Sequence, residues 1–255
     1  MRKLYLIITI AAIGMWACGK SEEEEMGELV LNELSANQAG DGVVLSWTWN
    51  GSGTLDSVVI YLNNTKVATV TQGTSYTHQT NQTGTYMLKG YHGSHAHESN
   101  TRSTEPVSSS VTVYERSHPG GPSGLTIGSD YKFVTKSLND QYAESTVYYY
   151  YTDCRENYSN GPNYYLSSPV NGACNELSGF QITSYIKADP SFNGVVTDPG
   201  NSTYAQLNSN STYALRFQVS GKTYYALAKT GGSVGQTVTL DIKVQTISGL
   251  RIIGQ

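Results

Sequence analysis

The stretch "DSVVIYLNNTKVATV", residues 56–70, decides the fold class of this chain. Valine, isoleucine, threonine and tyrosine, which favour strands, fill much of both arms. The arms meet at Asn63 and Asn64, and asparagine tolerates the positive φ angle that a tight hairpin turn requires. The stretch therefore predicts a β-hairpin whose turn is formed by these two asparagines.

Similar short runs lie on both sides of this hairpin and continue to the end of the chain. "LVLNELSA" starts at Leu29, and "GVVLSWTW" covers residues 42–49. In the second run Leu45, Trp47 and Trp49 alternate with other residues, so the two-residue period of a strand places them on one face. Turn-forming residues separate the runs, and helical periodicity is almost absent beyond the N-terminal segment. We therefore predict an all-β fold.

Over residues 28–115 the order of the runs resembles a fibronectin type III domain, which is an immunoglobulin-like sandwich. The resemblance rests on "LSW" with Trp47, the hairpin at 56–70, "TYMLKGY" at 85–91 and "STEPVSSSVTV" at 103–113. It implies two packed sheets with Trp47 in the core and "STEPVSSSVTV" as the last strand.

A segment rich in proline and glycine follows this first domain. "SHPGGPSG", residues 117–124, holds two prolines and three glycines, which cannot propagate a strand ladder, so we predict a linker over residues 116–124. Beyond it, residues 125–255 again show short strand-like runs, including "FQVSGKTYYALA" with a hairpin turn at Ser220 and Gly221. This part predicts a second β-sandwich or jelly-roll-like domain.

The N-terminal segment has the pattern of an export signal. A basic pair precedes an apolar run over residues 4–13, and Ala17 precedes Cys18; a membrane-spanning helix would need about 20 apolar residues. Residues 1–17 resemble a bacterial lipoprotein signal peptide, with "MWAC" as its lipobox. The resemblance implies that Cys18 becomes the first mature residue and carries acyl chains that hold the protein on a membrane. The alternative is an ordinary secreted protein with a chance cysteine at the cleavage site.

Residues 18–27 include four consecutive glutamates. Their position after Cys18 resembles the acidic export signal of surface lipoproteins in Bacteroidetes-type bacteria. That resemblance implies an outer membrane lipoprotein exposed at the cell surface, with residues 18–27 as an acidic tether. A solvated, disordered tail is the alternative interpretation of such a charge run.

Charge and cysteine content narrow the classes of partner and compartment. A net charge of −4 and a pI near 5.7 give no basic surface for nucleic acid. The chain has three cysteines, and lipidation of Cys18 would leave Cys154 and Cys174. In an oxidising compartment we expect these two to form a disulfide, with two free thiols as the alternative.

Three histidines lie close together in "YHGSHAHESN", residues 91–100. His95 and His97 project to one side of an extended segment, and with His92 they could hold zinc, copper or nickel. The fibronectin resemblance places this stretch in the loop between the last two strands. The interpretation that we favour is an exposed polar loop, and we expect no other cofactor.

No set of catalytic residues emerges from the sequence. The carboxylates beyond residue 125 select no facing pair of the kind that glycoside hydrolysis requires. Residues 125–255 contain no histidine, and no Gly-x-Ser-x-Gly occurs. We therefore expect a protein that is not an enzyme, and a hydrolase of surface polymers is the less favoured alternative.

Tyrosine is the most frequent aromatic residue, with 20 copies. Where tyrosines are adjacent on a strand, one of each pair points outward, and outward tyrosines suit stacking on sugars or contact with proteins. We select Tyr149, Tyr151, Tyr164 and Tyr225 as ligand-binding candidates; the alternative is that tyrosine serves here only as a strand former. The predicted function is binding or adhesion to extracellular glycan or protein, with a structural spacer or assembly subunit as the alternative.

Overall fold

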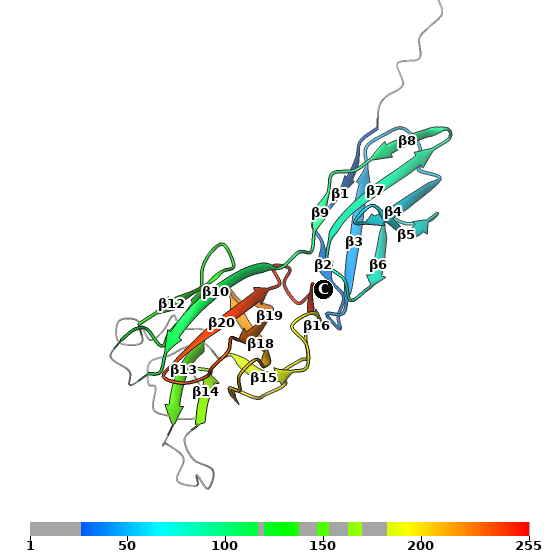
Figure 1. Ribbon diagram of the computed structural model, residues 1–255. Helices are drawn as coiled ribbons and strands as arrows, with labels where there is room; N and C mark the ends of the chain where they lie inside the picture. Colours follow the sequence, from blue (N-terminus) through cyan, green and yellow to red (C-terminus); the bar gives the residue numbers. More distant parts are fainter. Residues whose placement is uncertain (1–26, 117–119, 138–146, 153–162, 170–182, 255) are drawn as a thin grey trace, which may run out of the picture.

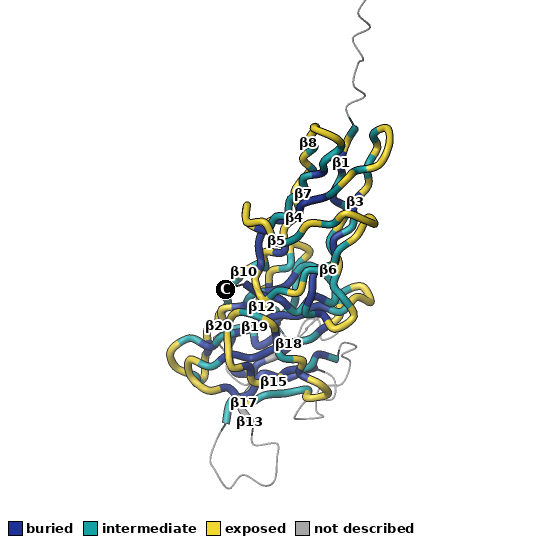
Figure 2. Tube along the Cα trace, turned by 90° about the vertical axis from the view of Figure 1, so that its right-hand side faces the viewer, coloured by how far each residue is buried: buried dark blue, intermediate teal, exposed yellow. Residues whose placement is uncertain are grey.

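The computed structural model describes residues 27–116, 120–137, 147–152, 163–169 and 183–254. These residues form two β-sandwiches that lie end to end (Figure 1), and buried residues, dark blue in Figure 2, lie on the strands of both. The all-β prediction is confirmed. In the described part of the chain, no helix has the length and hydropathy needed to cross a membrane.

The first sandwich consists of two antiparallel sheets. One sheet is built on β3 (Gly42–Trp49), which pairs with β1 (Leu29–Leu31), β2 (Ser35–Ala36) and β6 (Ser75–Gln79). The other has the order β5 (Thr65–Val70), β4 (Ser57–Leu62), β7 (Thr85–His92), with β8 (His95–Glu98) and β9 (Arg102–Ser103) also on β7.

Two local predictions for this sandwich are confirmed. The β4–β5 hairpin turns at Asn63 and Asn64, whose φ angles are 50° and 63°. Trp47 is 4% exposed and belongs to the core cluster that also holds Leu45 and Tyr86. Alternation along β3 predicted that Trp47 and Leu45 share a face, and the core position of Trp47 is the one that the resemblance implied.

The second sandwich packs two five-stranded sheets face to face, which agrees with the sandwich-like all-β character predicted for this part of the chain. The first sheet has the order β10 (Val107–Tyr114), β20 (Thr237–Val244), β19 (Lys222–Thr230), β18 (Thr212–Val219), β15 (Tyr185–Asp189). The second has the order β12 (Phe133–Lys136), β11 (Gly124–Ile127), β13 (Val147–Thr152), β14 (Asn163–Ser167), β17 (Tyr204–Gln206). Both sheets contribute to one core, in which the Phe133 and Phe217 rings meet edge-on at 5.6 Å. The β18–β19 hairpin turns at Ser220 and Gly221 as predicted, with φ angles of 49° and 76°.

The predicted boundary between the two domains is wrong, because β10 belongs to the second sandwich. Residues 107–114 pair along their whole length with β20, and Val113 is fully buried in the second core. The backbone N–H of Tyr114 also donates to the carbonyl of Pro122 at 3.0 Å, and Gly124, predicted as the end of the linker, begins strand β11 of the second sandwich. The alternating serines and valines of β10 fit any half-buried strand, and they do not specify which sheet receives it.

The last residues of the chain return to the first sandwich. Leu250 and Ile252 are fully buried in the core of that sandwich. The Arg251 backbone N–H donates to the carbonyl of Gly40 at 2.7 Å, and its Nε donates to that of Ala39 at 3.0 Å. The strand β21 (Ile252–Ile253) also pairs with β16 (Gly194–Val195) of the second half, near the point marked C in Figure 1. The two sandwiches are therefore linked by two crossings of the chain.

A buried glutamine joins these crossings. Gln245 has no exposed surface, and its Nε2 donates to the carbonyls of Thr104 and Ile252 at 3.1 and 2.6 Å. Its Oε1 accepts from the Ile247 backbone N–H at 3.1 Å. The amide thus satisfies backbone groups just before β10 and in the returning C-terminal segment at once.

Replacing Gln245 with leucine, which has a similar volume but no polar atoms, tests this junction. Gln245→Leu leaves two buried carbonyls and one N–H without their partner, and we expect it to lower the free energy of unfolding by about 2–4 kcal/mol. The control is Gln38→Leu at an exposed position, which should stay within about 0.5 kcal/mol of the parent. Urea denaturation measures both, and equal stabilities for the two variants would contradict the role of Gln245.

Candidate ligand-binding groove

The structure places two of the four predicted tyrosines in the interior. Tyr149 is fully buried in the core of the second sandwich, and its hydroxyl donates to the carbonyl of Gly235. Burial raises the pKa of the Tyr149 hydroxyl, so the side chain stays neutral. The prediction that Tyr149 points outward is wrong, because the four consecutive tyrosines of β13 conceal which alternate positions face the core.

The prediction that Tyr225 is exposed for ligand binding is also wrong, but for a different reason. It lies on the face of β19 away from the main core, but it is only 8% exposed. Phe192, Val196 and Ile253 form a small cluster with it, so the face is covered by the segment around β16 and by β21. Alternation along the strand does not indicate this cover, because the covering residues are remote in sequence.

The other two tyrosines provide no exposed platform among the described atoms. Tyr164 is half-buried and stacks on Tyr149, with ring centroids 5.6 Å apart and planes at 19°. Tyr151 pairs with Tyr164 in the sheet, but its side chain lies outside the described part. The predicted disulfide residues Cys154 and Cys174, like the predicted lipidation residue Cys18, also lie outside the described residues.

The three histidines belong to the β7–β8 hairpin and not to a loop. His92 lies opposite His95 in the ladder, and its Nδ1 is 2.8 Å from the carbonyl oxygen of Thr54. His97 packs edge-on against Trp49 with ring centroids 4.7 Å apart. Within the described ranges, no three His, Cys, Asp or Glu side chains come together as a metal-binding group. Two of the three rings, those of His92 and His97, instead serve protein contacts.

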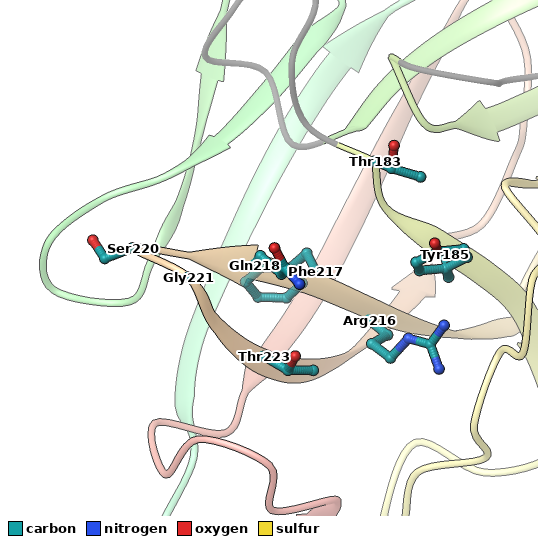
Figure 3. Close-up of a pocket in the computed structure, with 8 residues that line it drawn as sticks. All are labelled: Thr183, Tyr185, Arg216, Phe217, Gln218, Ser220, Gly221 and Thr223. Atoms are coloured by element: carbon teal, nitrogen blue, oxygen red, sulfur yellow. The ribbon is translucent and has the colours of Figure 1, made fainter.

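A groove instead lies on the outer face of the second sandwich, where β15 meets β18 (Figure 3). Tyr185 and Arg216 are direct neighbours across the two strands, and the guanidinium carbon lies 4.2 Å from the centroid of the tyrosine ring. The Arg216 Nη1 donates to Asp198 Oδ1 at 2.8 Å, and Nη2 donates to the carbonyl of Gly200 at 2.7 Å. These bonds fix the guanidinium against the ring.

Neutral polar groups form the rest of the groove. Gln218 and Thr223 are partners across the β18–β19 hairpin, and Thr183 and Ser220 add two hydroxyls, as Figure 3 shows. The hollow has a volume of about 450 Å³, in the range of small-molecule sites. None of its described lining residues is a histidine, a cysteine or a carboxylate. The arrangement can bind a ligand through one aromatic ring and several oriented donors and acceptors.

Sequence reasoning did not single out Tyr185 or Arg216, although one signal was present. Arg216 interrupts the apolar run "TYALRFQV" of β18. A cation between leucine and phenylalanine must face away from the core, and it needs a partner there. The position of its partners, in the turn after residue 197 and on β15, comes only from the tertiary fold.

His78 is a further titratable group that the sequence did not mark. Its Nδ1 lies 2.8 Å from the hydroxyl oxygen of Tyr86, which is fully buried in the first core. Burial lowers the pKa of His78 below its ordinary value of 6.5. The folded state therefore favours the neutral imidazole.

This pKa shift predicts a pH dependence of stability. As pH falls below 6.5, the ordinary pKa of histidine, the unfolded chain binds a proton at His78 more readily than the folded chain, so stability should decrease. His78→Gln removes this titration and should flatten the decrease between about pH 7 and 5. Urea denaturation of parent and variant at matched pH values measures the difference. Parallel pH profiles would show that His78 is not the responsible group.

Comparison with known proteins yields no relative for this chain. No family model matches it, and neither a curated protein nor a solved structure does. The geometry of the described residues is therefore the basis for any statement about function.

Proposed function

We propose that this protein is a surface-anchored lipoprotein that acts without catalysis, and that the β15–β18 groove binds an extracellular glycan. The observation that carries the proposal is the Tyr185–Arg216 pair. The guanidinium lies over one face of the Tyr185 ring, and the stacked pair offers apolar ring carbons for sugar C–H groups and N–H donors for sugar hydroxyls.

The charges at the groove favour a neutral glycan. Arg216 is ion-paired with Asp198, so the pair adds no net charge to the site. Arg216 uses one N–H group on Asp198 and one on Gly200, and a guanidinium has further N–H groups that can donate to sugar hydroxyls. Gln218, an exposed amide in the same groove, offers a donor and an acceptor side by side, which matches hydroxyls on adjacent ring carbons.

The remaining parts of the proposal place the groove relative to a membrane. Acylation of Cys18 would anchor the chain, and the acidic residues up to 27 would serve as the tether. The first sandwich would then be a fibronectin type III-like spacer. Its strand arrangement supports this, with β1, β2 and β6 on β3 in one sheet and β5, β4, β7 and β8 in the other. A disulfide between Cys154 and Cys174 belongs to the same proposal for an oxidising compartment.

A structural role is the second candidate, and the two chain crossings at Gln245 favour it. A protein that only separates two partners benefits from a stiff connection between its domains, and so does an assembly subunit. In that case the groove would contact protein, and no glycan would be retained. Binding to glycans thus separates the two candidates.

The Tyr185→Ala variant tests glycan binding at the groove. On a glycan array, the chain with Cys18→Ser should retain a defined set of glycans, and Tyr185→Ala should weaken that signal at least about tenfold, because stacking and the packing of Arg216 are both lost. Tyr61→Ala, which removes a half-buried tyrosine from the first sandwich, is the matched control and should bind like the parent. The proposal fails if the parent retains no glycan, or if both variants lose binding equally.

A further inference from the structure

A second hollow lies in the first sandwich and has a different character. It has a volume of about 520 Å³, and its lining includes the half-buried Trp49 and, at its base, the core residue Trp47. Thr71, Gln72 and Thr74, all exposed, line its rim. We refer to this hollow as the tryptophan cleft. None of its described lining residues carries a charge.

The tryptophan cleft is remote from the groove on the second sandwich. Trp49 ends β3 and pairs with Leu29, whereas the chain just before the other end of β3, at Gly40, contacts Arg251 at the junction. A strand of this length spans roughly 25 Å. The cleft therefore lies at the end of the first sandwich that points away from the junction.

Surrounding groups hold Trp49 in one orientation. A Cβ built on Gly27 or Gly51 would lie 2.1 Å from the six-membered ring of the indole, so only glycine allows this approach. The His97 ring contacts the indole from another direction. The indole Nε1 is buried and, within the described residues, has no hydrogen-bond partner. A side chain fixed in this way loses little conformational entropy when a ligand binds.

We propose that the tryptophan cleft binds a neutral sugar ring. Indole offers the largest aromatic surface among the side chains for the C–H face of a pyranose. The threonine hydroxyls and the Gln72 amide match sugar hydroxyls, which act as donors and acceptors at once. The uncharged lining gives no counter-ion for a uronate or a phosphate, whose burial would be costly. This site is independent of the β15–β18 groove and adds to the function proposed for it.

Tryptophan fluorescence can observe this cleft separately from the groove. The chain has three tryptophans, at positions 16, 47 and 49, so in the full chain with Trp16→Phe all tryptophan emission comes from the cleft. Titration with cellobiose, maltose, lactose and N,N′-diacetylchitobiose should give a saturable change of emission for at least one. Adding Tyr185→Ala should leave that titration unchanged, because Tyr185 lies on the other sandwich. If Tyr185→Ala lost binding on the glycan array while the fluorescence titration stayed unchanged, the result would report on the groove and not on the tryptophan cleft.

Variants of the rim identify the chemistry of the ligand. Gln72→Leu and Thr74→Val remove hydrogen-bonding groups at exposed positions, and each should weaken the responding disaccharide at least about fivefold. Gln38→Leu, at the junction end, is the control and should not change the affinity. Equal thermal midpoints for all variants establish that the fold is retained. No saturable change with any of the four disaccharides would overturn the proposal, and so would tighter binding by the rim variants, which would indicate an apolar ligand.

Discussion

The buried amide of Gln245 is the interaction on which the architecture depends. Burial of an amide is costly unless its hydrogen bonds are made, and here Thr104, Ile252 and Ile247 all supply partners. Two of these partners lie in the returning C-terminal segment, and the third precedes β10. One side chain therefore fastens both crossings of the chain, and neither sandwich holds its complete set of core segments without the other. A cut in the Pro/Gly segment would separate β10 from the sheet that needs it.

This connection has a consequence for function. The β15–β18 groove and the tryptophan cleft lie on different sandwiches, and the junction holds the two bodies in one arrangement. If each site binds a sugar, the spacing between them is set by the fold and not by a flexible linker, so a repeating polymer of matching period would bind with higher effective affinity than a short one. The same stiffness would hold the groove away from the membrane if Cys18 carries a lipid.

The sequence predicted features that depend on neighbouring residues correctly, and it missed features that depend on residues far apart in the chain. Asn63-Asn64 and Ser220-Gly221 specify their hairpins through their own backbone preferences, and alternation along β3 places Trp47 on the same face as Leu45. The sheet that receives β10 and the cover over Tyr225 depend on partners more than 100 and about 30 residues away. The site residues show the same limit, because Arg216 is conspicuous in its strand whereas its contacts with Tyr185 and Asp198 arise only from the fold.

Native-state hydrogen exchange tests most directly whether the two sandwiches form one cooperative unit. The slowest amides of the first sandwich, such as that of Ile60 on the central strand β4, are compared with those of the second, such as that of Ala226 on β19. Each core contains a segment that is connected through the other sandwich, so neither core can open alone. We therefore expect the opening free energies of the Ile60 and Ala226 amides to agree within about 1 kcal/mol. Opening free energies that differ by several kcal/mol would contradict this account and would show two domains that unfold independently.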